Sequence, residues 1–385
     1  MTIVFRLLII LSFFMLTGFS SAEKEPTDIQ PYTLKNGLST FVIHNKNDYS
    51  KNEVDLRLLI RAGSLQENDN ERGYAHFVEH MAFNGTTDFP SNDIIEHQES
   101  LGMVFGRDVN AMTEYYTTSY YLHLPNNSDK MMDEGFHMLS QQASALTFDS
   151  EELEKERPVV EEEWRSGRHM MGRIGSANRE ILLANSRFGE REPIGDMELV
   201  RHVDAERIKA FWQDWYHPNN MTLLVVGATN KQQVETMLKR YFAPLAAKTL
   251  PARQDLTVPL VNQLSLDVIA DKEITTEVLS FNFTEREAIP TTEDELRISL
   301  VNQLTIDVFN KRLREQYKLE GKNISKLVAM SRPLATGYRN NRLMAILTSD
   351  NYVAATQEVF TQMNRFAEHG FAQGDLDFAM QRHDR

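Results

Sequence analysis

Hydrophobic and polar residues follow two different periods along the chain, and these periods predict its strands and helices. Apolar residues alternate through residues 54–60, the two-residue period of a strand with one buried face. Further strands are expected on both sides of the Asn36-Gly37 turn and, from their β-branched and aromatic content, within residues 108–125 and 220–228. Helical spacing and helix-boundary residues predict helices at four segments, which are residues 71–83, 92–102, 130–144 and 148–166.

The order of these elements predicts two domains joined by a linker. Residues 246–260 contain proline and alanine without periodicity, which indicates a linker between a first domain at 23–245 and a second at 261–385. After the linker the pattern again predicts a strand, a long helix, a strand and a helix. A last helical pattern opens near Gly374 and no strand follows it, so we expect the second domain to be truncated at its C-terminal end.

The predicted fold class is α+β. We expect two homologous α/β-layer domains, each a mostly antiparallel sheet with helices packed on one face. Composition agrees with a globular protein, since 41% of the 385 residues are hydrophobic and 25% are charged. The formal net charge of −14 argues against a general nucleic-acid-binding protein, which would need a basic surface.

The N-terminus has the pattern of a secretory signal peptide. Arg6 precedes an apolar run that ends at Phe19, and small residues up to Ala22 offer a cleavage site. A membrane anchor is the alternative, but the run is too short for a comfortable span of about 20 residues. We therefore expect residues 1–22 to be removed, and the mature chain to be periplasmic or secreted with no membrane segment.

Two histidines and a glutamate share one face of the helix predicted at residues 71–83. His76, Glu79 and His80 stand at positions i, i+3 and i+4, which lie on the same side of an α-helix. The chain has no cysteine, so imidazole and carboxylate are its available zinc ligands, and a catalytic zinc takes three of them. His76 and His80 are candidate ligands, and Glu79 suits a general base acting on metal-bound water. The order H-x-x-E-H is that of the inverzincins.

A third ligand is expected on the helix predicted at residues 148–166. Glu156 and Glu163 are seven residues apart and therefore lie close to one helix face. Glu163 is the candidate ligand, and Glu156 is a candidate acceptor for a hydrogen bond from a ligand histidine. Pro158 lies between them and removes one helical hydrogen bond, which leaves the relative orientation of the two glutamates open.

Spacing alone leaves a structural alternative open. An H-x-x-E-H pattern also arises by chance on half-buried helices, and a run of glutamates is usually a solvated face. Six other histidines show no ligand spacing and are interpreted as surface, strand or turn residues, namely His97, His123, His137, His169, His202 and His217.

Five segments, in order, resemble the pitrilysin/insulinase family of zinc peptidases and, within it, the periplasmic PqqL-like branch. They are ERGYAHFVEHMAFNGT, FGRDVNAMTEYYTTSYYLHLP, ERPVVEEEW, REPIG and WYHPNNMTLLVVG, and the resemblance runs from about residue 30 to the end of the chain. It implies one Zn²⁺ per chain bound by His76, His80 and Glu163. It also implies Glu79 as the base and Glu156 as the supporting carboxylate.

The resemblance further implies a substrate-binding edge strand and a larger assembly. Members of the family bind an extended peptide along an edge strand, which here corresponds to Val109, Asn110, Ala111, Met112 and Thr113. Members of the PqqL-like branch have two halves that close around the peptide, and the arginine and tyrosine that assist the tetrahedral intermediate lie in the second half. This chain resembles the first half only, so a missing C-terminal half or a second subunit is an expected partner.

The predicted function is that of a zinc-dependent endopeptidase acting on peptides or small unfolded proteins. The alternative is a non-catalytic or weakly active half-shell that binds peptide or a partner subunit. The complete H-x-x-E-H pattern favours the enzyme, because non-catalytic relatives typically lose the metal motif. A zinc-carrying stress or storage protein is a further alternative, but it would not need Glu79.

Overall fold

The computed structural model describes residues 29–44, 52–260, 263–320 and 323–383. Within these ranges the chain divides into two compact units, and the division falls between Thr257 and Val258. This point lies inside the predicted linker, where residues 246–260 form neither helix nor strand. The predicted signal peptide lies outside the described residues, and the assignment of a peptidase domain and a second domain remains a prediction.

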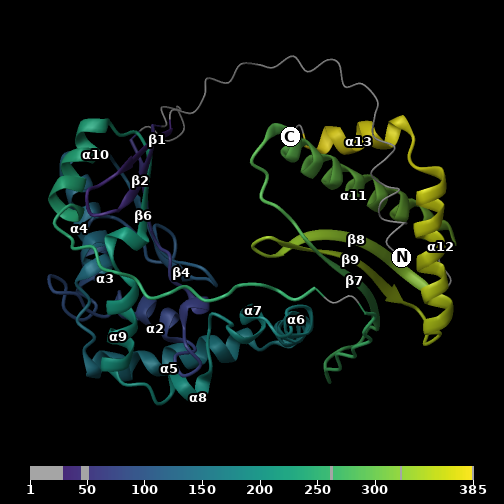
Figure 1. The fold of residues 1–385 in the computed structure, drawn as a ribbon, viewed down its shortest axis with the longest axis horizontal. Helices are drawn as coiled ribbons and strands as arrows, with labels where there is room; N and C mark the ends of the chain where they lie inside the picture. Colours follow the sequence, from purple (N-terminus) through teal and green to yellow (C-terminus); the bar gives the residue numbers. More distant parts are fainter. Residues whose placement is uncertain (1–28, 45–51, 261–262, 321–322, 384–385) are drawn as a thin grey trace. The chain divides into compact units, whose positions relative to one another are not determined.

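The first unit contains a six-stranded sheet in the order β1-β2-β6-β3-β5-β4 (Figure 1). Neighbouring strands are antiparallel except β2 and β6, which are parallel. In the centre of the sheet, Leu56 of β3 lies opposite Leu122 of β5 on one side and Val225 of β6 on the other. The strands are β1 (Ile29–Thr33), β2 (Ser39–His44), β3 (Val54–Ile60), β4 (Val109–Thr113), β5 (Thr118–Leu124) and β6 (Met221–Gly227).

The alternation predicted for β3 is confirmed by its burial. Val54, Leu56, Leu58 and Ile60 are fully buried, while Arg57 between them is exposed. Strands β5 and β6 alternate in the same way. Because each fully buried side chain of this size contributes roughly 1.5–3 kcal/mol, this one apolar face is a main source of stability for the unit.

Helices of the first unit pack against this sheet and against one another. Helix α2 contacts β4 and β5, and helix α4 contacts β3 and β5. Helix α2 also contacts α5 and α9. The four helices predicted from the sequence correspond to α2, α3, α4 and α5. The helical elements are η1 (Ser64–Gln66), α2 (Tyr74–Met81), α3 (Asp93–Ser100), α4 (Asp129–Ser144), α5 (Ser150–Gly167), α6 (Met170–Leu182), α7 (Arg187–Glu190), α8 (Met197–Val200), α9 (Ala205–Trp215), η2 (Pro218–Asn220), α10 (Lys231–Met237) and the π-helical turn η3 (Leu238–Phe242).

The second unit has a three-stranded antiparallel sheet in the order β7-β9-β8 (Figure 1). Its elements are β7 (Val278–Arg286), α11 (Glu293–Glu320), β8 (Ile324–Ala335), β9 (Tyr338–Leu347), α12 (Tyr352–His369) and α13 (Gln373–His383). Strand β8 is not among the elements predicted from the sequence. It contains Pro333 and lies at an edge of the sheet, where a strand tolerates proline.

The predicted α+β fold class is confirmed by these two sheet-and-helix units. Both sheets are mostly antiparallel, with β2–β6 as the parallel pair. Across the described ranges, no helix combines the length and the apolar composition that a bilayer crossing requires.

Candidate metal centre

The apolar side of helix α2 determines which way the helix is turned about its own axis. Phe77, Val78 and Met81 are fully buried in the core of the first unit. Because residues three and four apart share a helix face, this burial leaves His76 and His80 together on the side that meets α5.

Helix α5 runs without interruption from Ser150 to Gly167, although Pro158 lies inside it. Asp149 caps its N-terminus, where one carboxylate oxygen accepts hydrogen bonds from the backbone N–H groups of Glu151 at 2.8 Å and Glu152 at 3.1 Å. The orientation of the glutamates, left open by Pro158 in the sequence, is therefore set by one continuous helix.

One face of α5 combines core residues with two carboxylates. Leu153 and Val160 are buried, and Glu156 and Glu163 follow them by three residues each. This spacing places all four on the same side of the helix. The apolar pair anchors α5 against the core, and the acidic pair points with it toward α2.

Glu163 meets both histidines of α2. Its Oε2 atom lies 3.5 Å from Nε2 of His76 and 3.4 Å from Nε2 of His80. Possible ligand atoms of the three residues all lie within 4.8 Å of one another, and within the described ranges no other group of histidines and acids meets this criterion. Two imidazoles and one carboxylate are the donor set of several catalytic zinc sites.

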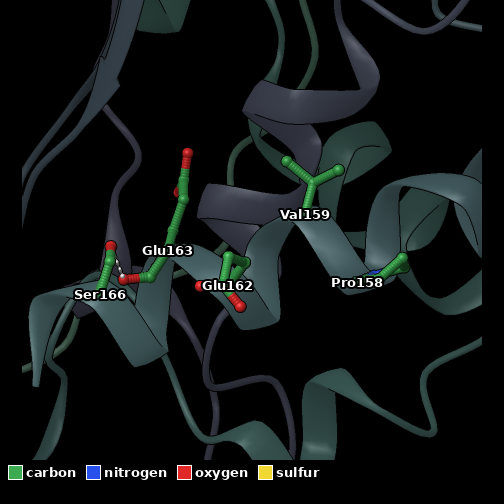
Figure 2. Close-up of a pocket in the computed structure, with 5 residues that line it drawn as sticks. All are labelled: Pro158, Val159, Glu162, Glu163 and Ser166. Carbon is green, nitrogen blue, oxygen red and sulfur yellow. Dashed lines mark hydrogen bonds between the residues drawn. The ribbon is translucent and has the colours of Figure 1, made fainter.

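The Glu163 carboxylate is accessible from solvent. Figure 2 shows its side chain standing out from α5 on the same side as Val159, while Glu162 is turned away from it. The open hollow beside it is lined by Pro158, Val159, Glu162, Glu163 and Ser166. The side chain of Glu163 is 49% exposed, so a water molecule or a substrate can approach the three residues from this side.

His80 is oriented by Glu156. Nδ1 of His80 donates to Oε1 of Glu156 at 2.6 Å, and the two side chains are only 12% and 16% exposed. This bond holds a proton on Nδ1, so Nε2, which faces Glu163, is the possible ligand atom of His80.

The electrostatics of the three residues fit a bound cation. Burial lowers the pKa of His80, but hydrogen bonds and charge from Glu156 and Glu163 outweigh this effect and raise it to about 10. Burial, followed by the charge of His80, lowers the pKa of His76 to about 4. A divalent cation bound at the Nε2 atoms of the two histidines would balance the negative charge of the carboxylates.

Glu79 is hydrogen-bonded to Thr113, whereas the two histidines contact glutamates of α5. The Thr113 hydroxyl, at the end of β4, donates to the Oε2 atom of Glu79 at 2.5 Å. Burial raises the pKa of Glu79 to about 7, against the hydrogen bond from Thr113, which lowers it. A carboxylate with a pKa near 7 can both take up and release a proton at neutral pH.

A chain of buried hydroxyl groups continues behind Thr113. Its Oγ1 atom lies 3.3 Å from Oγ1 of Thr118, which donates to the Ala62 carbonyl at 3.0 Å. The hydroxyl groups of Tyr120 and Tyr216 lie 3.0 Å apart, and Tyr216 is hydrogen-bonded to Thr118. The polar groups behind Glu79 are thus paired with one another.

Strand β4 lies at the edge of the sheet next to this site. Among the named strands it pairs with β5 alone. Val109 and Thr113 are buried, whereas Asn110 and Met112 are exposed and Ala111 is partly exposed. Its position at the edge and its contact with α2 agree with the place predicted for a substrate strand, while substrate binding itself stays a prediction.

The structure thus brings the predicted residues His76, His80, Glu163, Glu156 and Glu79 into one site. The hydrogen bond from Thr113 to Glu79 was missed, since the sequence predicts Thr113 only as part of the substrate strand. No spacing rule links residues 34 positions apart, so only the folded sheet shows this contact.

A site of two helical histidines, a helical glutamate ligand candidate and a buried glutamate has the composition of an inverzincin metallopeptidase. The chain belongs to the insulinase family, peptidase family M16. Residues 42–177 match the model for insulinase (peptidase family M16), and residues 202–382 match that for the peptidase M16 inactive domain.

Two curated relatives of the chain are zinc proteases by name. The chain is 32% identical to "Probable zinc protease PqqL" of Haemophilus influenzae and 34% identical to the protein of that name in Escherichia coli, in each case over 96% of this chain. It also matches the crystal structure of the first half of the periplasmic protease PqqL from Escherichia coli, with a TM-score of 0.84 and 34% identity over 93% of this chain and 77% of that chain. The chain spans 41% and 40% of the lengths of the two curated relatives.

Proposed function

We propose that this chain carries the zinc centre of an endopeptidase that hydrolyses peptides or small unfolded proteins. The observation that carries the proposal is the convergence of His76, His80 and Glu163 within 4.8 Å, beside a separate buried carboxylate, Glu79. Membership of the insulinase family and the names of the relatives support the same chemistry.

In this proposal, the metal ligands, the base and the supporting carboxylate are different residues of the site. His76, His80 and Glu163 would bind one Zn²⁺, which when bound supplies a Lewis acid for a water molecule and a substrate carbonyl. Glu79 would accept a proton from the attacking water and pass it to the leaving amine. Glu156 would hold His80 in the tautomer and ring orientation that binding requires.

The edge strand β4 would position the substrate. An extended peptide would add to the sheet along residues 109–113 through backbone hydrogen bonds, which require little from its side-chain sequence. Because Thr113 ends this strand and donates to Glu79, a peptide bound there would pass close to the base.

Replacement of the base tests this function directly. Zinc-loaded chain and its Glu79→Gln variant are assayed on an unstructured fluorogenic peptide, and zinc content is measured in the same samples. The variant should keep its zinc and lose about a hundredfold or more in kcat, the contribution of a general base. Glu154→Gln is the matched control, because Glu154 lies on α5, is 66% exposed, pairs with Arg157 and does not line the hollow beside Glu163.

Two results would contradict the proposal. Undiminished hydrolysis by the Glu79→Gln variant would show that Glu79 is not the base. Loss of zinc from that variant, to the extent seen in His80→Ala, would show that Glu79 is a ligand and that the roles are wrongly divided.

A second candidate function is a peptide-binding half with weak hydrolysis of its own. It is favoured by one observation, that the chain spans about two-fifths of the curated relatives. Loss of a single group that stabilises the tetrahedral intermediate typically costs about a hundred- to a thousandfold in rate. Turnover that rises by this factor when a polypeptide matching the remainder of the relatives is supplied would support this candidate, and unchanged turnover would exclude it.

For location, we propose export and cleavage after Ala22, giving a mature chain that begins at Glu23 in the periplasm. The sequence pattern of residues 1–22 and the periplasmic relative from Escherichia coli support this. Intact-mass measurement of the exported protein should give the mass of the chain from Glu23, and a retained Met1 would refute it.

A further inference from the structure

A second buried carboxylate lies next to the proposed zinc helix but takes no part in the chemistry described above. Glu67 follows η1, in the loop between β3 and α2, and its residue is fully buried. Its Oε1 atom accepts a hydrogen bond from the backbone N–H of Ala75 at 2.8 Å, and its Oε2 atom accepts one from the N–H of Gly73 at 3.1 Å.

These two bonds replace the usual cap of α2. The residue at the N-cap position is Gly73, at φ +105°, and it has no side chain to accept an N–H bond. A carboxyl group from outside the helix therefore satisfies free donors at this end. Burial raises the pKa of Glu67 to about 8, while the hydrogen bonds from Ala75 and Gly73 lower it. Ala75 directly precedes His76, so the anchored turn and the first candidate ligand are adjacent in the chain.

The loop that carries Glu67 is attached to the end of β4. The backbone N–H of Ser64 donates to the carbonyl of Glu114 at 3.2 Å, and that of Leu65 donates to the carbonyl of Tyr115 at 3.0 Å. Glu114 directly follows Thr113, whose hydroxyl donates to Glu79. One loop thus links the start of α2 to the strand that orients the base.

Two arginines attach the same loop from its other side. Arg187 Nε donates to the carbonyl of Leu65 at 3.1 Å, and Arg191 Nε donates to the carbonyl of Glu67 at 3.3 Å. The Arg191 side chain is only 2% exposed, and its own carbonyl accepts from the Ser64 hydroxyl at 2.7 Å. Glu67 therefore projects from a segment that is hydrogen-bonded on two sides to elements other than α2.

We infer that Glu67 is a positioning residue for the zinc centre, which sets the position of α2 so that His76 and His80 meet Glu163 and Glu79 meets Thr113. This inference rests on the proposed function for the metal, but it concerns a residue that touches neither metal nor substrate. A functional site needs its groups placed within about 0.5 Å, and an anchor one residue before His76 acts directly on that placement.

Glu67→Gln tests the inference because it keeps the length of the side chain. The amide has one acceptor oxygen in place of two, and its NH₂ group would face one of the two N–H donors. Glu71→Gln is the matched control, since Glu71 belongs to the same loop but its carboxylate accepts from the N–H of Asn68 and not from α2. Zinc affinity is measured by competition with a chromophoric chelator, and ligand geometry by the visible absorption of the Co²⁺-loaded protein.

Glu67→Gln should weaken zinc binding by about ten- to a hundredfold, the range for residues that hold metal ligands in place, and should change the Co²⁺ spectrum. Amide hydrogen exchange at Gly73 and Ala75 should become faster in the metal-free protein. The Glu71→Gln control should stay within about twofold of the original chain in zinc affinity. If Glu67→Gln does not fold, Arg191→Lys, which keeps the charge but loses the Nε bond to the Glu67 carbonyl, should show the same changes to a smaller extent.

The inference is overturned if folded Glu67→Gln, or folded Arg191→Lys in its place, binds zinc as tightly as the original chain with an unchanged Co²⁺ spectrum. A lower unfolding midpoint with unchanged zinc affinity would also overturn it, because Glu67 would then be structural alone. If the original chain binds no zinc, the proposed function fails. Exchange at Ala75 then decides whether Glu67 anchors α2, since faster exchange in the variant supports the anchor and unchanged exchange refutes it.

Discussion

The contact between His80 and Glu156 allows the energetics of the zinc site to be predicted in detail. The 2.6 Å bond joins two side chains that are 12% and 16% exposed, so it is little screened by water. Hydrogen bonds to charged groups contribute about 1.5–3 kcal/mol, and bonds between neutral groups about 0.5–1.5 kcal/mol. Glu156→Gln keeps an acceptor but loses the charge, which should cost about 1–1.5 kcal/mol of zinc binding, or about tenfold in Kd.

Glu156→Ala extends the same series. It removes the acceptor and leaves the buried Nδ1–H of His80 without a partner, which costs about 3 kcal/mol in total, or about a hundredfold in Kd. Both variants and a Glu154→Gln control are titrated with zinc against a chelator at one pH and one ionic strength. Glu154 is a suitable control because its carboxylate is 66% exposed, pairs with Arg157 on α5 and does not line the hollow beside Glu163.

The order of the affinities is the critical result. We expect the control to bind zinc as tightly as the original chain, Glu156→Gln to bind it more weakly, and Glu156→Ala to bind it most weakly. If both Glu156 variants bind zinc within about twofold of the original chain, Glu156 does not orient a ligand, and the role assigned to its hydrogen bond is wrong.

Three further predictions follow from individual side chains. Burial raises the pKa of Glu79 to about 7, so kcat/KM should fall as the pH drops below about 7, and a flat profile from pH 5 to 8 would exclude it as the base. Burial raises the pKa of Asp375, but Lys311 and Arg312 outweigh this and lower it from 3.8 to about 2. The charged Asp375 contributes about 2 kcal/mol to the free energy of unfolding above about pH 4, and this contribution is lost as the pH falls to about 2. Denaturant unfolding measured over this pH range should therefore show a loss of stability that the Asp375→Asn variant lacks. Gly195 has φ +81°, and a Cβ there would lie 2.2 Å from the α-carbon of Gly73. Gly195→Ala should therefore lower the free energy of unfolding by about 2–4 kcal/mol, and an unchanged midpoint would refute this packing.

Sequence periodicity predicted β3 and the four helices α2 to α5, but the helices α6 and α9 were not predicted, although the burial of α9 follows a helical period. The alternation along β3 is a property of one short segment, so it needs no knowledge of the partner strands. Strand β8 was missed because it is an edge strand with polar positions and Pro333, and its pairing with β9 becomes visible only in the folded sheet. The short helices α7 and α8, of four residues each, are below the length at which a helical period can be recognised.

The candidate ligands could be predicted because their spacing is local. His76 and His80 are one turn apart, and Glu156 and Glu163 are two turns apart, so helix geometry alone places each pair on one face. Contacts between distant segments have no such rule. Glu67 meets Ala75 across a loop that contains a left-handed glycine, and this geometry is not encoded in any local period.

The central claim is that zinc is bound by His76, His80 and Glu163, with Glu79 outside the ligand set. X-ray absorption at the zinc edge, recorded on the chain loaded with one equivalent of Zn²⁺, measures this ligand set directly. The account predicts four nitrogen or oxygen ligands at about 2.0–2.1 Å with the scattering of two imidazoles, and the same two-imidazole spectrum for Glu79→Gln. A spectrum with fewer than two imidazoles, or one that changes when Glu79 is replaced, would contradict it.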